Sequence, residues 1–493
     1  MLAVRLAAGR GPADVLVLPV TGGDGQLVDV GGVPAEVAEE CAALLAQAAR
    51  APDGDPGPRV GQAGKVHVLP RPLGRPRRVL LVGIGDGGEA GWRAAGAAAV
   101  RSGARERALT VALPGDVAPA AVRGLVEGLL LAGYRFRLGA QRPDGPRLRR
   151  VRVAVPDPER FDAEVAEATV VAELTCLARD LTNTPSITKT PAWFARQVAT
   201  RAAAGLRVRV WRETELAEAG FGGLLAVGGG SANPPRLLEL SWRPRRAREH
   251  VVLVGKGITF DTGGISIKPS DAMILMRKDM AGAAAVAAAT LGAAELELPV
   301  RVTALTPLAE NMPSGSALRP GDVVRHFGGR TCEIRNTDAE GRLVVADALA
   351  YAAARLRPDV LVDLATLTGA NAVALGKRTG ALYSDDDALA QALAAAAAEA
   401  GEKVWRMPLV EDYREALGSD LADLINAPEG AGSVLAALFL REFTGSARHR
   451  WAHIDMSAPS WIERDEAELS RGATGWGVRT LLRWLRARSQ APR

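Results

Sequence analysis

The sequence of 493 residues contains little cysteine and little histidine, and each scarcity excludes a class of site. The three cysteines, Cys41, Cys176 and Cys332, lie far apart in the chain, so they form no CxxC metal-binding pair. Their sparse, odd number is typical of a reducing compartment. The five histidines show no HExxH or HxH spacing, which disfavours a zinc site built from histidine.

Long apolar runs and a strong excess of one charge are also missing. No run of about 18 or more apolar residues occurs, so we expect no transmembrane helix. The first 20 residues contain scattered Arg and Gly instead of a clean apolar core, so we expect no secretory signal and a cytoplasmic location. The net charge is +5, and the basic clusters at 71–78, 145–152 and 242–248 lack interleaved aromatic residues. Nucleic-acid binding is therefore disfavoured, although a secondary role as a DNA-binding regulator remains the alternative.

Lysine is rare among the charged residues. Lysine and arginine together number 61, and only seven of them are lysine, yet Lys256, Lys268 and Lys278 fall close together. A lysine amine can lose its proton and offer a lone pair, whereas a guanidinium effectively cannot. The cluster therefore hints at a required amine, with chance clustering as the alternative.

Apolar runs alternate with Ala-rich segments along the whole chain, which predicts an α/β protein. The first part contains strand candidates at 15–20, 77–85, 109–115 and 151–157. A helical pattern at 161–183 follows. The second part contains strand candidates at 207–211, 237–242, 250–257, 300–308, 331–335 and 359–366. We therefore predict an N-terminal α/β domain at 1–165, a linker helix at 166–189 and a second α/β domain at 190–493.

Three Gly-rich segments could be mistaken for ligand-binding motifs. GIGDGG (83–88) matches G-x-G-x-x-G between a strand and a helix, but no acidic residue closes the next strand as a dinucleotide site requires. A plain turn is the favoured interpretation. VGKGIT (254–259) lacks the other residues of a P-loop, and GGGSANPP (228–235) lacks the G-x-S-x-G pattern of a serine nucleophile.

The segment 254–284 places charged residues at the end of an apolar strand, which is where open α/β sheets bind ligands. Lys256 and Asp261 flank this strand end, and Lys268 follows a Gly-Gly turn. Asp279 precedes AGAAAVAAAT, whose small residues allow close packing. Each acid alone would be interpreted as a helix cap or a turn residue.

A second segment, NTDAEGRL (336–343), changes that interpretation. If it is extended, alternation puts Asp338 and Glu340 on one side, with Arg342 continuing the row. Together with Asp261, these acids would repel one another strongly if buried without partners. Clustered carboxylates with few histidines therefore imply a shared site for Mg²⁺, Mn²⁺ or Zn²⁺.

The second part of the chain resembles the leucyl aminopeptidases, the cytosol aminopeptidase family (peptidase family M17) of dinuclear metallo-exopeptidases. The resemblance is carried by GKGITFDTGGISIKPS, MRKDMAGAA, NTDAEGRL, DLATLTGA, SDLADLINAP and WAHIDMSAPSW. The first part resembles the family's N-terminal domain only weakly. The resemblance implies a smaller, macro-like N-terminal α/β domain and a larger catalytic α/β domain whose mixed central sheet is flanked by helices.

The resemblance also implies a set of metal ligands. One ion would bind Asp261, Glu340 and both the carboxylate and the backbone carbonyl of Asp338. The second would bind the neutral amine of Lys256 together with Asp261, Asp279 and Glu340. The implied cofactors are two divalent ions per subunit, Mn²⁺ or Zn²⁺ with Mg²⁺ as a further candidate, and a bicarbonate ion.

Further roles follow from the same resemblance. Lys268 would stay protonated and polarise the scissile carbonyl, while Arg342 would hold the bicarbonate that acts as general base. Met276, Thr366 and Gly369 match positions near the side-chain pocket. The implied reaction is release of leucine-like residues from peptides with a free N-terminus, by a homohexamer. The text MSAP in WAHIDMSAPSW departs from the usual Ile-Ala-Gly-like text, which should alter the shape of the pocket.

Overall fold

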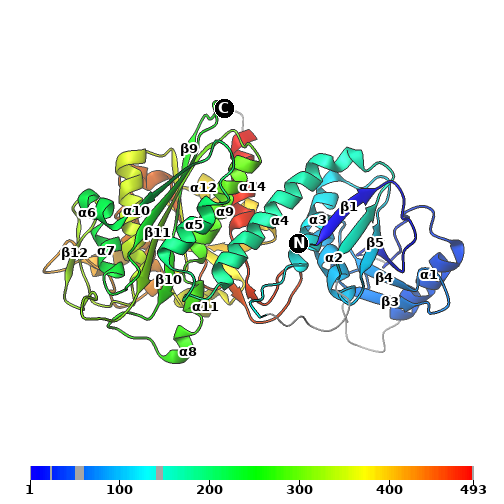
Figure 1. Ribbon diagram of the computed structural model, residues 1–493, viewed down its shortest axis with the longest axis horizontal. Coiled ribbons are helices and arrows are strands. Elements are labelled where there is room, and N and C mark those ends of the chain that lie inside the picture. Colours follow the sequence, from blue (N-terminus) through cyan, green and yellow to red (C-terminus); the bar gives the residue numbers. More distant parts are fainter. Residues whose placement is uncertain (1, 23–24, 50–59, 140–147, 491–493) are drawn as a thin grey trace. The chain divides into compact units, whose positions relative to one another are not determined.

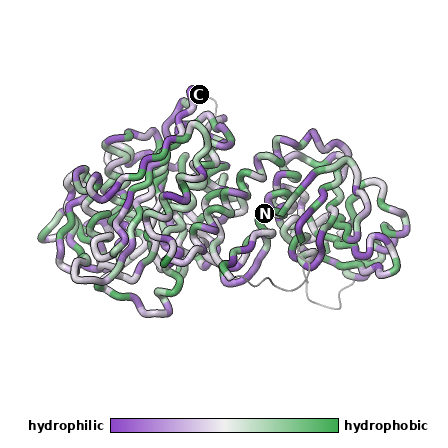
Figure 2. Tube along the Cα trace, viewed as in Figure 1, coloured by the Kyte–Doolittle hydropathy of each residue, from purple (hydrophilic) through white to green (hydrophobic). Residues whose placement is uncertain are grey.

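The computed structural model describes residues 2–22, 25–49, 60–139 and 148–490, which fold into two compact units. Unit 1 contains Met1–Cys176 and Glu463–Arg471, and unit 2 contains Leu177–Ile462 and Gly472–Arg493. Helix α4 (Asp162–Asn183) begins in unit 1 and ends in unit 2 (Figure 1). Hydrophobic segments occur throughout both units (Figure 2).

Unit 1 is built on a six-stranded sheet in which only the edge strand β3 is antiparallel to its neighbour. In spatial order the strands are β1 (Ala3–Ala7), β6 (Arg150–Ala154), β5 (Ala108–Ala112), β2 (Val15–Val20), β4 (Arg78–Gly83) and β3 (Val66–Pro70). The helices are α1 (Ala35–Ala49), α2 (Glu89–Ser102) and α3 (Pro119–Ala132), with a 3₁₀ turn η1 (Glu159–Phe161). Every residue of β2 is buried, which explains its unbroken apolar run.

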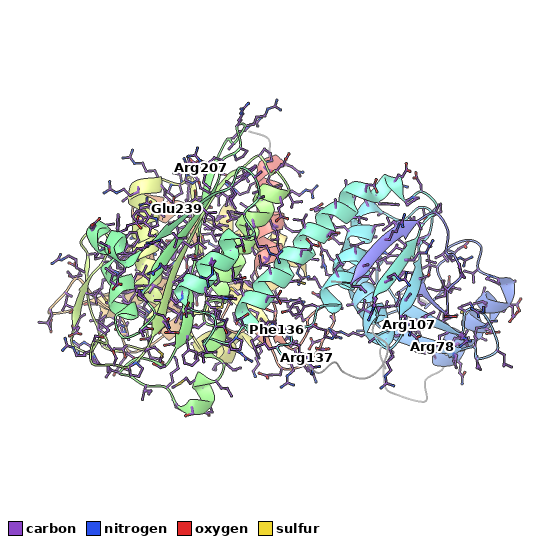
Figure 3. The ribbon with its side chains drawn as sticks, in the orientation of Figure 1. Arg78, Arg107, Phe136, Arg137, Arg207 and Glu239 are labelled. Atoms are coloured by element: carbon purple, nitrogen blue, oxygen red, sulfur yellow. The ribbon has the colours of Figure 1, made fainter. Side chains whose placement is uncertain are left out.

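The loop GIGDGG joins β4 to α2 and carries an acidic side chain of its own. Oδ1 of Asp86 accepts a hydrogen bond from the Gly88 amide at 2.9 Å, and Glu89 lies in the first turn of the helix. Glu106, the nearest acid toward the next strand, pairs with Arg78 at 2.9 Å (Figure 3 labels Arg78). The Asp86 carboxylate therefore already occupies an amide donor that a bound pyrophosphate would use, as expected for a plain turn.

Unit 2 contains a mixed sheet of nine strands. In spatial order they are β16 (Lys403–Arg406), β15 (Thr379–Tyr383), β18 (Trp451–Asp455), β14 (Val360–Ala365), β9 (His250–Gly255), β11 (Arg301–Asn311), β8 (Arg236–Trp242) and β7 (Arg207–Trp211), while β10 (Gly257–Asp261) pairs with the far end of β11. The four central strands β18, β14, β9 and β11 are parallel, and their neighbours β15 and β8 are antiparallel to them. Two small sheets add β12 (Val323–Arg325), β13 (Thr331–Glu333) and β17 (Leu424–Ile425), and β19 (Trp461–Ile462) and β20 (Gly472–Ala473).

Helices cover both faces of this sheet (Figure 1). One face carries α9 (Ala281–Glu295), α12 (Asp387–Ala400) and α14 (Val478–Gln490), and the other carries α7 (Gly222–Gly228), α10 (Gly341–Tyr351) and α13 (Gly432–Arg441). The shorter elements are α5 (Pro191–Ala199), α6 (Glu213–Ala219), α8 (Ser270–Met273), α11 (Ala370–Leu375), the 3₁₀ turns η2 (Met276–Lys278), η4 (Glu411–Leu417) and η5 (Gly445–Arg450), and the π-turn η3 (Ala352–Leu356). The predicted arrangement of two α/β units, the larger with a mixed sheet, is confirmed.

Burial on both faces explains why the central strands lack a polar–apolar alternation. Val252 and Val254 of β9 belong to the core shared with α7, α10 and α13. Val251 and Leu253, which alternate with them along the strand, are fully buried as well. The three cysteines are buried free thiols. Among the described residues, no helix is both long enough and apolar enough to cross a membrane.

His250 begins β9 and is a buried neutral base. Its Nε2 lies 2.9 Å from Oγ1 of Thr303 on β11. Burial lowers the pKa of His250 to about 4, and the positive charge of Arg301 adds to this effect. In the unfolded chain the His250 imidazole takes up a proton near pH 6.5, whereas in the folded chain it does so only near pH 4.

We therefore expect the contribution of His250 to the free energy of unfolding to be largest above pH 6.5 and to fall as the pH drops toward 4. His250 should account for about 1–2 kcal/mol of the loss between pH 7 and pH 5. Urea unfolding of the wild type and of His250→Gln at both pH values measures this contribution. Equal pH dependence in the two proteins would contradict the prediction.

Candidate metal centre

The charged residues of the two sequence motifs meet at the carboxyl ends of the central strands. Lys256 directly follows β9, Asp261 ends β10, and Thr366 directly follows β14. Asp279 lies just before α9 and Glu340 just before α10. Parallel strands place all these ends at one edge of the sheet, and the partial positive charge of a helix N-terminus favours each acid that precedes a helix.

Three carboxylates form the centre of the cluster. Oxygen atoms of Asp261, Asp338 and Glu340 all lie within 4.8 Å of one another, a separation from which one cation can be shared. Asp261 and Glu340 are buried, and Asp338 is partly buried. The fold therefore brings the segments 254–284 and 336–343 into contact.

Two lysine ammonium groups lie among these acids. Nζ of Lys256 is 2.9 Å from Oδ2 of Asp279 and 2.8 Å from Oε1 of Glu340. Nζ of Lys268 is 2.9 Å from Oδ2 of Asp261 and also contacts Asp338. Four carboxyl groups against two ammonium groups leave an excess of negative charge in a buried site.

The pKa values of the acids reflect this excess. Burial raises the pKa of Glu340 to about 8, and the negative charge of Asp261 acts in the same direction while Lys256 opposes it. Burial likewise raises the pKa of Asp279 and of Asp338. These carboxyl groups are therefore harder to ionise together than in water, which a bound cation would reverse.

The pKa values of the two lysines are raised as well, although burial acts on them in the opposite sense. Burial lowers the pKa of Lys256, but the neighbouring Asp279 and Glu340 outweigh burial and hold it above its ordinary value. The pKa of Lys268 is also raised, because Asp261 and other carboxylates outweigh burial there. Both side chains are ammonium ions in this charge environment, so a cation that binds the Lys256 amine must displace its proton.

The residues present fit divalent cations. Oδ2 of Asp279, Oδ1 of Asp338 and Oε1 of Glu340 are buried, and none makes a hydrogen bond of ordinary geometry to any described residue, although each faces a lysine. Buried carboxylate oxygens normally have such donors. Oxygen atoms plus one displaceable amine make a donor set suited to Mn²⁺, Zn²⁺ or Mg²⁺.

Polar groups behind the cluster fix the orientation of its acids. Nδ2 of Asn311, the last residue of β11, donates to Oδ1 of Asp261 at 2.8 Å and to the Thr337 carbonyl at 3.1 Å. The amide of Gly263 also donates to Oδ1 of Asp261, at 2.8 Å, from a turn in which its φ is +86°. Oγ1 of Thr366 donates to Oδ1 of Asp279 at 2.7 Å. Such contacts orient ligands toward a metal.

The expectation of an extended segment through Arg342 is wrong. After β13 the chain turns at residues 337–338, and α10 begins at Gly341. The turn separates the directions of Asp338 and Glu340 from that of Arg342, which lies in the first helical turn. The residues after Gly341, LVVADALAY, face the core, and their burial favours a helix over an extended strand.

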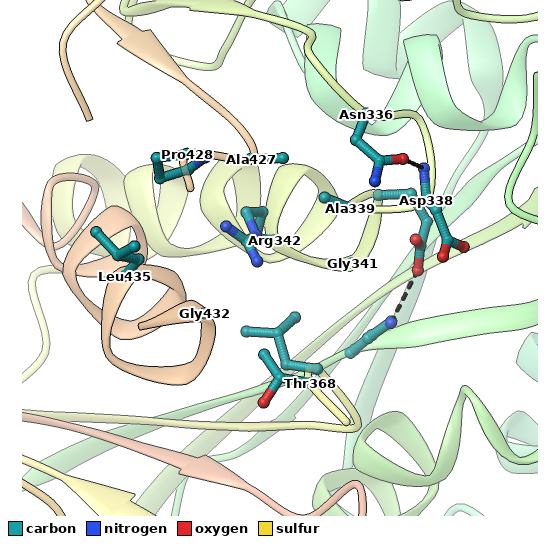
Figure 4. A pocket seen from close by; sticks show the side chains of 13 residues that line it. Asn336, Asp338, Ala339, Gly341, Arg342, Thr368, Ala427, Pro428, Gly432 and Leu435 are labelled. Atoms are coloured by element: carbon teal, nitrogen blue, oxygen red, sulfur yellow. Dashed lines mark hydrogen bonds and ion pairs between the residues drawn. The ribbon is translucent and has the colours of Figure 1, made fainter. Parts of the chain in front are cut away.

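Arg342 is buried beside a cavity that opens toward the cluster. Its Nη1 donates to the Asn426 carbonyl at 2.6 Å, and its Nε has no hydrogen-bond partner among the described residues. Burial lowers the pKa of Arg342 to about 10, so the side chain remains charged near neutral pH. The cavity has a volume of about 250 Å³, and Figure 4 shows the Arg342 side chain between Asp338 and Leu435.

The three predicted pocket residues lie in different surroundings. Met276 is partly exposed in η2, and Gly369 is exposed just before α11. Thr366 is buried, and its carbonyl accepts from Nζ of Lys256 at 3.0 Å. Lys278, the third clustered lysine, donates to the Ser457 carbonyl at 2.7 Å.

Two asparagines at the site were not predicted from the sequence. Asn311 lies 50 residues from Asp261, and Asn426 lies 84 residues from Arg342. The only available signal for Asn426 was its place in SDLADLINAP. Neither asparagine carries a charge or a recognisable spacing relative to the acids.

Gly341 leaves room for the Lys256 amine. A Cβ at position 341 would lie 2.4 Å from Nζ of Lys256, so Gly341→Ala must displace the amine. We expect Gly341→Ala to weaken Mn²⁺ binding by about 10–100-fold. Gly432→Ala is the matched control, because a Cβ at this cavity-lining position meets nothing within 4 Å. Titration of free Mn²⁺ by electron paramagnetic resonance measures both variants, and equal affinities would refute the expectation.

Comparison with known proteins agrees with this geometry. Residues 176–482 match the family model described as "Cytosol aminopeptidase family, catalytic domain", and residues 17–138 match "Cytosol aminopeptidase family, N-terminal domain". The "Probable cytosol aminopeptidase" of Micrococcus luteus is 43% identical, covering 97% of this chain and 96% of its own length. The protein of the same name from Leifsonia xyli subsp. xyli is 47% identical over 80% of this chain and 81% of its own.

A solved structure is also similar along nearly the whole chain. The structure titled "Bottromycin maturation enzyme BotP in complex with Mn" has a TM-score of 0.84 and 43% sequence identity, covering 97% of this chain and 100% of that chain. The matches span both units. The chain therefore belongs to the cytosol aminopeptidase family, peptidase family M17, whose members are metallo-exopeptidases.

Proposed function

We propose that this aminopeptidase removes leucine-like residues from the free N-terminus of peptides, with two divalent ions and a bicarbonate ion as cofactors. The observation that carries the proposal is the buried cluster of four carboxylates around two lysines. Its buried carboxylate oxygens face only the two lysine ammonium groups among the described residues, and the excess negative charge supports binding of cations. The Mn complex of the similar BotP structure makes Mn²⁺ the first ion to test.

Asp261, Glu340 and Asp338, with the Asp338 backbone carbonyl, would hold one ion in this proposal. Lys256, Asp279 and the shared Asp261 and Glu340 would hold the other. Two such ions supply a water of lowered pKa and stabilise the negative charge that develops on the attacked carbonyl. The close approach of oxygens from Asp261, Asp338 and Glu340 supports the assignment.

The two lysines would have opposite protonation states in the loaded enzyme. Lys256 gives up its proton to become a ligand, because only the neutral amine has a lone pair to offer. Lys268 would keep its proton and donate a hydrogen bond to the oxygen of the scissile carbonyl. A free α-amino group of the substrate would bind one of the two ions, which would restrict cleavage to the first peptide bond.

Arg342 would hold the bicarbonate. Its Nη1 is fixed by the Asn426 carbonyl, while its buried Nε has no described partner and can donate to an anion. The first turn of α10 adds the partial positive charge of a helix N-terminus. An anion fixed there would accept a proton from the attacking water, which is the role of a general base.

The leucine preference rests on the apolar surroundings of the site. Met276, Thr366 and Gly369 are the proposed side-chain pocket, and Leu367 and Leu435 line the nearby cavity.

We also propose that the chain works in the cytoplasm as a homohexamer, because its relatives are named cytosol aminopeptidases and the family resemblance implies that assembly. Light scattering of the purified protein measures the subunit number.

The proposed reaction predicts a metal-dependent assay result. Chelated protein should not hydrolyse leucine p-nitroanilide, and adding back Mn²⁺, Zn²⁺ or Mg²⁺ singly should restore the absorbance of released p-nitroaniline. N-acetylleucine p-nitroanilide should resist cleavage, because its amine can no longer bind at the cluster. Equal cleavage of the acetylated substrate would exclude an aminopeptidase mechanism.

Substitutions should separate the catalytic from the metal-binding residues. Lys268→Ala should lower kcat by about 10²–10³-fold and Arg342→Ala by about 10²–10⁴-fold, because each removes a group that acts on the reacting atoms. Both should keep their metal content, measured by mass spectrometry, whereas Asp261→Ala and Glu340→Ala should lose metal and activity together.

Exposed Lys377 provides the control, since Lys377→Ala removes an equal charge away from the cluster. Bicarbonate added to carbonate-free buffer should raise the kcat of the wild type and leave that of Arg342→Ala unchanged. Full activity of Glu340→Ala would refute the metal assignment, and a bicarbonate response in Arg342→Ala would refute the anion site.

A further inference from the structure

The turn at 334–340 carries Asp338 and Glu340, yet it has little regular structure of its own. It connects the short strand β13 to α10, and beyond β13 only Ile334 continues the backbone pairing, with Gly321 and Asp322. A turn of this kind gains its rigidity from contacts outside itself. Thr337 is held by Asn311, Gly263 and Ser266, and the side chain of Asn426 contacts the backbone of the residues on either side, Arg335, Asn336 and Ala339.

Asn426 is fully buried, and both ends of its amide face the turn. Its Oδ1 accepts from the backbone amides of Arg335 at 2.8 Å and Asn336 at 3.3 Å. Its Nδ2 donates to the carbonyls of Asn336 at 2.6 Å and Ala339 at 3.4 Å. The side-chain amide therefore spans the turn from Arg335 to Ala339, the residue between Asp338 and Glu340.

The backbone of Asn426 makes two further contacts. Its amide donates to the Glu333 carbonyl at 3.1 Å, which continues the pairing of β17 with β13. Its carbonyl accepts from Nη1 of Arg342 at 2.6 Å. One residue thus holds the end of β13, the turn and the Arg342 guanidinium in a single arrangement.

Only asparagine satisfies every partner at this position. Two amide donors face Oδ1 and two carbonyl acceptors face Nδ2, so the partners themselves fix which end is oxygen. Aspartate would place a carboxylate oxygen against two carbonyl oxygens. A small apolar residue would leave buried backbone groups unpaired, which costs the desolvation of each.

We propose that Asn426 is a positioning residue that sets the directions of the Asp338 and Glu340 carboxylates and of the Arg342 guanidinium at the same time. The proposal rests on the proposed function, since it assigns those three side chains to cations and to an anion. Asn426 itself touches neither the cations nor the substrate. Its loss should therefore act through both sets of groups together.

The test compares Asn426→Asp with Asp423→Ala. Asp423 lies at the opposite end of the same strand pair, where its Oδ2 accepts from the amide and the hydroxyl of Thr331, both at 2.8 Å. The control therefore loosens β13 and β17 without a contact to the turn. Asn426→Ser is the second variant, in case the charge of Asn426→Asp prevents folding.

Two measurements do not depend on catalysis. Hydrogen–deuterium exchange of the metal-free protein should rise in the peptide covering 334–342 for Asn426→Asp and stay at the wild-type level for Asp423→Ala. Titration with Mn²⁺, followed by electron paramagnetic resonance, should show about 10–100-fold weaker binding in Asn426→Asp alone. Both effects are expected when the turn loses its hydrogen bonds to the Asn426 side chain.

Kinetics at saturating Mn²⁺ then tests the contact with Arg342. We expect kcat of Asn426→Asp to fall at least about 10-fold with KM changed less than about threefold, because an interaction used in the transition state is lost. In an Arg342→Ala background the same substitution should cost less, since the two residues act through one contact.

Unchanged exchange and unchanged Mn²⁺ affinity in folded Asn426→Asp and Asn426→Ser would overturn the proposal. Equal losses in Asp423→Ala would also overturn it, because the strand pair and not the asparagine amide would then be responsible. Failure of the proposed function has a different signature: the wild type itself would bind no Mn²⁺ and release no p-nitroaniline. The exchange measurement reports on the hydrogen bonds of Asn426 to the turn whether or not the protein binds Mn²⁺.

Discussion

The structure of the site depends on the mutual repulsion of four carboxyl groups in a place where little water can screen them. Asp261, Asp279 and Glu340 are almost completely buried, and only two ammonium groups oppose them. The raised pKa of Glu340 measures how unfavourable that charge is without cations. Neighbouring groups offset part of this repulsion. Gly263 and Asn311 donate hydrogen bonds to Asp261, Thr366 donates to Asp279, and two helix N-termini add partial positive charge.

The mixed sheet of unit 2 is what makes this concentration of charge possible. Its four central strands run in parallel, so the residues after β9 and β14 and at the end of β11 reach the same edge. Continuous burial of these strands on both faces fixes their ends in place, as the fully buried β9 illustrates. The flanking antiparallel strands widen the sheet without adding acids to that edge. The rigid packing of the central strands thus holds the charged groups at their carboxyl ends close together in spite of their repulsion.

Much of the fold could be predicted because buried parallel strands have a clear signature. The apolar runs of β2, β9 and β14 stand out in the sequence, and so do the charged motifs at their ends. Strands such as β1 and β16 are short and partly exposed, and their sequences AVRLA and KVWR show no such run. Alternation of charge in NTDAEGRL predicts an extended segment, but burial of the residues after Gly341 favours a helix there, with a turn before it.

Partners such as Asn311 and Asn426 could not be predicted because their contacts arise only from folding. Lys256 and Thr366 illustrate the distances involved: their hydrogen bond joins residues 110 positions apart. All charged residues of the cluster lie between Lys256 and Arg342, but β14 and β18, which complete the central sheet, come later in the chain. A fragment that ends before β14 would contain every charged residue of the cluster and yet lack Thr366, the partner that orients Lys256 and Asp279.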